Sequence, residues 1–214
     1  MCLFGIFVSI CHQLWNKTNS PQKYGIVSTI FKLVIKDIIE YIRQLQMRVS
    51  LQKRGIFLSQ TAVIRGKTES FTAGHGCTIS SHSIIEISDD PNGQTKDSRL
   101  TLEKYVYIGE SCNIRPAGSL IRIGANSMIA NGVTIVGSNH GKDMSALMRL
   151  QPWDMNKSGV SIGKDCWIAA GAIICPGSKI EDGAIVAAGA VVIGHVQAHS
   201  IVAGVPARFV RMRD

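Results

Sequence analysis

Residues 160–193, VSIGKDCWIAAGAIICPGSKIEDGAIVAAGAVVI, carry an aliphatic residue at every sixth position. A helix needs apolar residues at a period of 3.6 and a half-buried strand needs them at a period of 2, so this spacing fits neither. A period of six is typical of a hexapeptide-repeat β-solenoid, in which each unit is a short strand plus a turn with one inward aliphatic side chain. The sequence therefore predicts an all-β solenoid whose inward residues here are Ile162, Ile168, Ile174, Ile180, Val186 and Val192.

The same period extends over most of the chain, and we expect the solenoid domain to occupy residues 57–200. Polar, turn-forming residues interrupt it at 89–99, and the period slips by three across residues 118–122. Between residues 139 and 159 the period is lost, which predicts an inserted loop. Such long loops are uncommon in compact domains and are often functional. Residues 201–214 are expected to form a closing segment.

Residues 1–56 form a different, helical segment in this prediction. Apolar residues recur at a helical period after Ser20-Pro21, which predicts an amphipathic α-helix from about 22 to 50. Residues 1–54 hold eight Lys and Arg against two Asp and Glu, which is six of the net charge of +8. Two alternatives stay open for the apolar face of this helix. It caps the exposed end of the solenoid, or it makes a peripheral contact with the inner face of a membrane. The apolar run at residues 3–10 is too short to cross a bilayer.

The six cysteines show neither a CxxC pair nor the spacing of a metal site. Cys77, Cys112 and Cys166 lie two positions before an inward aliphatic residue, where a thiol acts as a small apolar filler. We therefore expect free thiols in a reducing cytoplasm and no bound metal.

Three motifs accompany the repeat, namely GVTIVGSNHG at 132–141, WIAAGA at 167–172 and VAGVPAR at 202–208. With them, residues 58–213 resemble the hexapeptide-repeat acetyltransferases, and most closely the O-acetyltransferases of capsule and lipopolysaccharide biosynthesis and the galactoside and maltose acetyltransferases. The resemblance implies a left-handed parallel β-helix with about 18 residues per coil. It also implies a homotrimer with acetyl-CoA sites between subunits, a sugar or glycan acceptor and no nucleic-acid partner.

Acetyl transfer from a thioester to a hydroxyl needs a base, a donor to the tetrahedral oxyanion and alignment of the reactants. The resemblance implies that His140 is the base, since an imidazole titrates near neutral pH. Asn139 beside it either orients the substrate or shapes the turn. Trp167 is implied to wall the acceptor pocket, although plain packing is the alternative. Asp143 is a candidate to orient His140.

The resemblance also implies a set of contacts to the co-substrate. The backbone N–H of Ala170 corresponds to the position that meets the thioester, and Ala188 to the position that contacts the pantetheine arm. Arg208 and Arg211 correspond to cations near the CoA phosphates, which suits a guanidinium. The chain departs from its relatives at Arg115, where the sugar enzymes place an asparagine. We interpret Arg115 as a contact to an anionic acceptor.

The favoured function is therefore acetyl-CoA-dependent O-acetylation of a sugar of a surface polysaccharide or its precursor. One alternative is N-acetylation of a nucleotide-linked amino sugar. Another is a non-catalytic β-helix scaffold. Binding of CoA distinguishes the enzymes from the scaffold.

Overall fold

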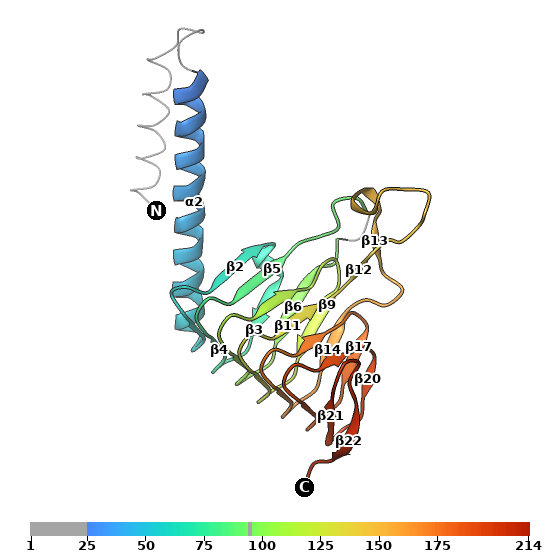
Figure 1. Cartoon of the computed structure of the whole chain (residues 1–214). Coiled ribbons are helices and arrows are strands. Elements are labelled where there is room, and N and C mark those ends of the chain that lie inside the picture. Colours follow the sequence, from blue (N-terminus) through green and yellow to red (C-terminus); the bar gives the residue numbers. More distant parts are fainter. Residues whose placement is uncertain (1–24, 94–95) are drawn as a thin grey trace. The chain divides into compact units, whose positions relative to one another are not determined.

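The computed structural model describes residues 25–93 and 96–214 (Figure 1). The chain divides into two compact units, residues 1–46 and 47–214, and all the described strands belong to the second. Helix α2 (Gly25–Lys53) crosses this boundary, and it ends about three residues later than predicted. The apolar run at 3–10 and the predicted helix start lie outside the described residues. Within the described residues, no helix has an apolar stretch long enough to cross a bilayer.

Three sheets wind around one core in the second unit, and their strands are parallel except for the last strand of sheet A. Sheet A contains β1 (Phe57–Leu58), β4 (Thr78–Ile79), β7 (Tyr107–Ile108), β10 (Met128–Ile129), β15 (Trp167–Ile168), β18 (Ile185–Val186), β21 (Ser200–Ala203) and β22 (Arg208–Met212). Sheet B contains β2 (Val63–Gly66), β5 (Ile84–Ile87), β8 (Asn113–Arg115), β11 (Thr134–Val136), β16 (Ile173–Ile174) and β19 (Val191–Val192). Sheet C contains β3 (Phe71–Ala73), β6 (Arg99–Leu102), β9 (Leu120–Ile123), β14 (Val160–Ile162), β17 (Ser178–Ile180) and β20 (His195–Val196).

The chain visits the three sheets in turn, so it forms a parallel β-helix, as the period of six predicts (Figure 1). Trp167 pairs with Ile185 and Ile173 pairs with Val191, which makes a regular coil eighteen residues long. The six inward residues predicted within 160–193 are each at most 2% exposed. They stack into one continuous apolar column, and this column is the core of the β-helix.

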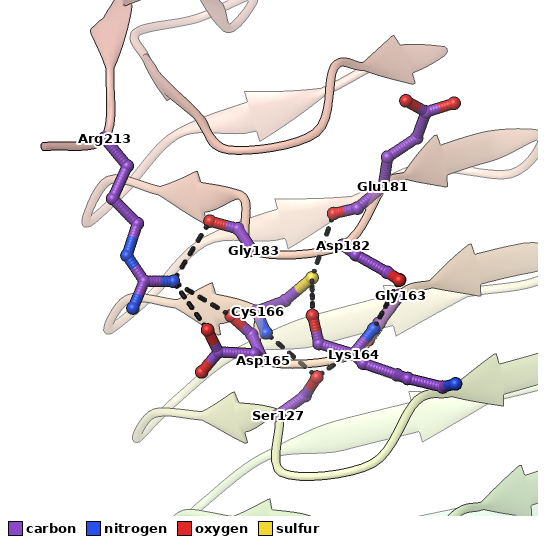
Figure 2. Close-up of polar contacts among 9 residues, drawn as sticks. All are labelled: Ser127, Gly163, Lys164, Asp165, Cys166, Glu181, Asp182, Gly183 and Arg213. Carbon is purple, nitrogen blue, oxygen red and sulfur yellow. Dashed lines mark hydrogen bonds and ion pairs between the residues drawn. The ribbon is translucent and has the colours of Figure 1, made fainter.

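Three buried cysteines fill the small positions of the core, as predicted. Cys77, Cys112 and Cys166 are each 1% exposed and are free thiols. The Cys166 Sγ donates to the carbonyl oxygen of Glu181 on the next coil (3.1 Å), and burial raises the pKa of this thiol (Figure 2). These thiols are therefore packing groups, and none is poised to react at neutral pH.

The last coil extends further than the period of six indicates. Val196 and Val202 are buried beyond Val192, and β21 still pairs in parallel with β18. The spacing from Val192 to Val196 is four, so one turn is shortened and the pattern in the sequence is broken. The closing strand is β22, which runs antiparallel to β21.

The last turn of α2, which belongs to the second unit, covers the first coil. Leu51 is 4% exposed and packs with the core. The Arg48 guanidinium donates to the carbonyl oxygens of Ala62 (2.6 Å), Leu58 (3.4 Å) and Ser59. These carbonyls lie at the first coil, and among the described residues no preceding coil supplies donors, so Arg48 satisfies part of an open end.

Candidate active site

The inserted segment leaves the β-helix at the corner that follows β11. It departs after Gly137 and returns at Gly159. The two ends of the segment are joined by a hydrogen bond from the Gly159 N–H to the Gly137 carbonyl oxygen (2.7 Å). The insertion contains β12 (Asn139–His140), the short 3-10 helix η2 (Met148–Leu150) and β13 (Trp153–Asp154). A second 3-10 helix, η1 (Thr68–Ser70), precedes β3. The predicted loop is thus an ordered hairpin with its own short strands.

His140 lies on this hairpin with its side chain exposed. β12 and β13 are antiparallel, with His140 opposite Trp153. The Gly141 N–H donates to the Pro152 carbonyl (3.0 Å), so His140 and Trp153 form a non-hydrogen-bonded pair. In such a pair the two side chains lie close on one face. The structure therefore presents the imidazole outward, on the same face of the hairpin as the Trp153 side chain.

Asp143 does not orient His140, contrary to the sequence-based suggestion. Its carboxylate accepts a hydrogen bond from the Ser145 N–H (2.8 Å), and this bond holds the pKa of Asp143 below its usual range. Within residues 25–93 and 96–214, no side chain donates to or accepts from the His140 imidazole. The hairpin backbone is therefore what sets its position.

Arg115 lies one coil below the insertion, in β8 opposite Val136 of β11. Its guanidinium contacts the Glu86 carboxylate (2.8 Å) and donates to the Asn113 side-chain oxygen (2.9 Å). Arg65 contacts the same carboxylate (2.8 Å), and the hydrogen bond from Arg65 is the largest cause of the lowered pKa of Glu86. Two guanidinium groups thus share one carboxylate. The column formed by Arg65, Glu86 and Arg115 therefore carries one net positive charge.

Trp167 and Asn139 are both exposed but lie on different parts of the coil. Trp167 is in β15 on the outward face of sheet A, whereas Asn139 is on the hairpin between sheets B and C. Trp167 is 45% exposed and so does not fill the chain's own core. Within the described residues of one chain, Trp167 neither hydrogen-bonds to His140 nor pairs with it between strands.

Ala170 and Ala188 take the same place on consecutive coils, at the corner between sheets A and B. Each lies two residues after the inward residue of β15 or β18, and the Gly189 N–H donates to the Ala170 carbonyl (2.9 Å). Both side chains are exposed. Among the described residues, no acceptor takes a hydrogen bond from either alanine N–H. This corner therefore offers two stacked backbone donors with small side chains.

Arg208 and Arg211 share one face of β22 because of an irregularity in its pairing. Arg208 lies opposite Ala203 and Arg211 opposite Ile201, with a register shift between Ile201 and Val202. Ala203 and Ile201 are the outward positions of β21. Residues three apart in a regular strand face opposite sides, so the bulge is what turns both arginines outward.

Arg213 anchors the end of this strand to two coils at once. Its guanidinium contacts the Asp165 carboxylate (2.8 Å) and lies near the carbonyl oxygens of Asp165 (3.4 Å) and Gly183 (3.3 Å) (Figure 2). Sequence reasoning gave Arg213 no role. Its partner lies 48 residues away, and the closing segment contains nothing that points to it.

The outward faces of the three sheets differ in polarity. Sheet A presents a largely apolar column, whereas sheet C presents mainly polar and charged groups. The column on sheet A includes Phe57, Tyr107, Met128, Trp167, Ile185 and Ile201. The column on sheet C includes Thr72, Thr101, Arg122, Ser161, Lys179 and His195.

A cavity of about 610 Å³ lies over sheet C, where the insertion returns to the coil. Met155 and Ser158 of the insertion line it together with Leu120, Arg122 and Lys179. None of the eight predicted site residues is among the described residues that line it. Within residues 25–93 and 96–214, no group of His, Cys, Asp or Glu side chains could hold a metal ion.

Sequence reasoning missed the residues that support the hairpin. Gln151 is 5% exposed, and its side chain bonds the backbone of Asp143 and of Ala146. Asp90 and Asn92, which lie in the polar interruption at 89–99, make hydrogen bonds to the backbone of the same hairpin. Their polar character is typical of a solvated turn, so composition alone gives no sign of these contacts.

Comparisons with known proteins agree with this architecture. The family model for bacterial transferase hexapeptide (six repeats) matches residues 159–194. The chain is 31% identical over 115 residues to WcaF of Escherichia coli (strain K12), a proposed colanic acid biosynthesis acetyltransferase, covering 54% of this chain and 59% of that protein. It is 30% identical over 152 residues to WbbJ of the same strain, a proposed lipopolysaccharide biosynthesis O-acetyl transferase, covering 67% of this chain and 69% of that protein. The match to WcaF thus spans less than two thirds of that relative's length.

Among solved structures, AntD, an N-acyltransferase from Bacillus cereus in complex with dTDP and 3-hydroxybutyryl-CoA, is similar with a TM-score of 0.64. The sequences are 20% identical, and the match covers 77% of this chain and 87% of that one. At this identity the likeness concerns the fold.

Proposed function

This chain belongs to the hexapeptide-repeat family of bacterial transferases, and we propose that it is an acetyl-CoA-dependent O-acetyltransferase. The acceptor in this proposal is a hydroxyl on a sugar of a surface polysaccharide or of its precursor. The names of WcaF and WbbJ place both in the biosynthesis of such glycans, and WbbJ is named for O-acetyl transfer. The observation that carries the proposal is His140, exposed on an ordered hairpin at the edge of the coil.

The proposed chemistry is direct transfer through a tetrahedral intermediate. A ring nitrogen of His140 takes the proton of the acceptor hydroxyl as the oxygen attacks the thioester carbonyl carbon. The free N–H of Ala170 suits hydrogen bonding to the oxyanion that forms. When the intermediate collapses, the C–S bond breaks and His140 returns the proton to the CoA sulfur. The products are the acetyl ester and free CoA.

The remaining predicted residues complete the proposed site. Ala188 contacts the pantetheine arm, with a side chain small enough to let it approach along the corner. Arg208 and Arg211 on the outer face of β22 bind the CoA phosphates. On the acceptor side, Asn139 and Trp167 contact the sugar.

We further propose that the coil is left-handed and that three chains form a homotrimer with sites between subunits. Two observations support shared sites. His140 follows β11, at the corner between sheets B and C, whereas Ala170 and Ala188 lie at the corner between sheets A and B. In the proposed trimer, a second subunit brings its base to the co-substrate corner. The apolar outward column of sheet A provides a surface for such an association.

The experiment is a rate measurement on the full chain with acetyl-CoA and a panel of neutral, anionic and amino-sugar acceptors. His140→Ala is expected to lower turnover by about 10²- to 10⁴-fold and to retain CoA binding. His75→Ala, which removes another exposed imidazole on the first coil, is the matched control and keeps its activity. An ester product is cleaved by mild alkali and an amide is not, which separates O- from N-acetylation.

Two outcomes would contradict the proposal. An active His140→Ala variant would remove the assigned base. Absence of CoA binding by the wild-type protein would remove the enzyme and favour a scaffold. Sedimentation analysis tests the trimer independently, because a monomer would exclude sites between subunits.

A further inference from the structure

Two segments that interrupt the repeat, far apart in the sequence, are joined by hydrogen bonds. The first lies between β5 and β6, and its described residues 88–93 and 96–98 rise to the insertion that carries β12 and β13 (Figure 1). The Asp90 carboxylate accepts a hydrogen bond from the Trp153 N–H (2.6 Å), across 63 residues of chain. The Asn92 side chain donates to the carbonyl oxygens of Arg149 (2.7 Å) and Gln151 (3.3 Å). We call residues 88–93 and 96–98 the strap.

The atom that Asp90 binds is one that the hairpin itself does not use. His140 and Trp153 form a non-hydrogen-bonded pair, so the Trp153 N–H points away from β12. Asp90 takes this outward N–H and thereby holds β13 at the residue directly opposite His140. The strap thus contacts the hairpin at the level of the imidazole.

The Asp90 carboxylate is nearly buried, and both of its oxygens are hydrogen-bonded. It is 7% exposed, although an unpaired carboxylate is costly to bury. Its second oxygen accepts from the Asn92 N–H (2.9 Å), which fixes the turn of the strap. Both carboxylate oxygens therefore receive backbone N–H groups, which are charge-assisted bonds of the stronger kind.

We propose that Asp90 is a positioning residue for His140, acting through the Trp153 backbone. This inference rests on the proposed function, in which His140 is the base. Because the described residues hold the imidazole by no side-chain contact, the position of the hairpin backbone decides whether the base meets the acceptor hydroxyl. A displacement of about 1 Å at a reacting group lowers a rate by about 10²-fold. Asn92 supports the same hairpin two residues further along the strap.

The test compares Asp90→Ala and Asp90→Asn in the full chain with wild type. Asp90→Ala is expected to lower kcat by about 10- to 100-fold, with the KM for acetyl-CoA within twofold of wild type. Asp90→Asn retains one oxygen that can accept from the Trp153 N–H and loses the acceptor for the Asn92 N–H, so it is expected to keep clearly more activity than Asp90→Ala. Asp97→Asn, which removes an exposed charge from the same strap, is the matched control and retains wild-type kcat.

Hydrogen exchange at the Trp153 amide gives a readout that does not depend on turnover. Asp90→Ala is expected to accelerate this exchange, whereas Asp97→Asn leaves it unchanged. If Asp90→Ala accelerates exchange but keeps wild-type kcat, the positioning role is wrong. If kcat and CoA affinity fall together, or if Asp90→Asn is as impaired as Asp90→Ala, the residue is structural and the inference is also overturned.

The same experiment separates failure of this inference from failure of the proposed function. If wild type transfers no acetyl group, or if His140→Ala is fully active, the proposed function fails and the positioning role falls with it. If wild type is active and His140→Ala is not, an Asp90→Ala variant with wild-type kcat overturns the positioning role alone.

Discussion

Replacing Gly137 by alanine tests whether the position of the His140 hairpin depends on close packing at its base. A Cβ at residue 137 would lie 2.0 Å from the Pro116 carbonyl oxygen and 2.3 Å from the Ser119 Oγ. Ordinary contacts begin at 3.4 Å, so a gap of about 1.4 Å has to open. Pro116 cannot yield freely, because its carbonyl accepts from the Ser119 Oγ (2.5 Å) and N–H (3.2 Å). The backbone that leaves the β-helix after Gly137 must move instead.

The expected magnitude follows from this displacement. Crowding of a packed position by one methyl group costs about 1–3 kcal/mol of unfolding free energy. His140 lies three residues beyond Gly137, and a shift near 1 Å at a base lowers a rate by about 10²-fold. Gly137→Ala is therefore expected to lose about two orders of magnitude in kcat. Its affinity for CoA is expected to stay within threefold of wild type, since the Ala170 corner is untouched.

The assay is steady-state kcat at saturating acetyl-CoA, with CoA affinity by calorimetry and stability by denaturant unfolding. Gly74→Ala is the matched control, because its Cβ would lie 2.6 Å from the Lys104 backbone nitrogen, at a corner of the first coil. It is expected to lower stability by a similar amount and to retain kcat. Wild-type kcat in Gly137→Ala, or an equal loss in Gly74→Ala, would refute the reasoning.

Two further predictions concern charged groups. The hydrogen bond from His195, followed by that from Lys179, lowers the pKa of Glu181 to about 2, so its contribution to stability is present above pH 4.5 and is lost as the pH falls towards 2. Carboxyl NMR of wild type should give this midpoint, His195→Ala should raise it towards 4.5, and an unchanged midpoint would contradict the assignment. Arg208→Ala and Arg211→Ala should each raise the KM for acetyl-CoA about tenfold without changing kcat. Acetyl-pantetheine, which lacks the nucleotide phosphates, should react unchanged, and an equal effect on both donors would exclude a phosphate contact.

The coils of this protein could be predicted because each inward position depends on local spacing alone. Ile168, Ile174 and Ile180 follow one another at six residues and are buried at the same position of consecutive turns. The burial of each of these residues follows from its spacing to its neighbours in the sequence, so no knowledge of distant contacts is needed to predict it. The same holds for Cys166, whose place two residues before Ile168 indicates a small buried side chain.

The supports of the hairpin could not be predicted, because they join interruptions of the repeat. Asp90 contacts Trp153 across 63 residues, and neither segment carries a period that fixes its course. The resemblance alone implies a role for Arg208 and Arg211, and their common face depends on a bulge that strand alternation does not reveal. The closing turn at Val196 escaped prediction because a shortened spacing breaks the only available signal.

Arg115 shows how a contact can change the meaning of a predicted site residue. The sequence suggests that it meets an anionic acceptor, but Glu86 already engages its guanidinium at 2.8 Å. Glu86 also holds Arg65, and its lowered pKa keeps it charged at neutral pH. The column therefore has one positive charge in excess. Any acceptor role for Arg115 depends on this excess charge, since neither arginine is free.

Removing the positive charge of Arg115 and removing the negative charge of Glu86 are therefore expected to change the KM for an anionic acceptor in opposite directions. Arg115→Ala is expected to raise the KM for a carboxylated acceptor about five- to tenfold, a modest effect because the group is partly exposed, and to leave a neutral acceptor unchanged. Glu86→Gln releases Arg115 and is expected to lower the same KM. Arg65→Ala is the matched control, because it removes an equal charge from the far side of Glu86. If Arg65→Ala and Arg115→Ala act alike, the acceptor senses only net charge and Arg115 makes no direct contact.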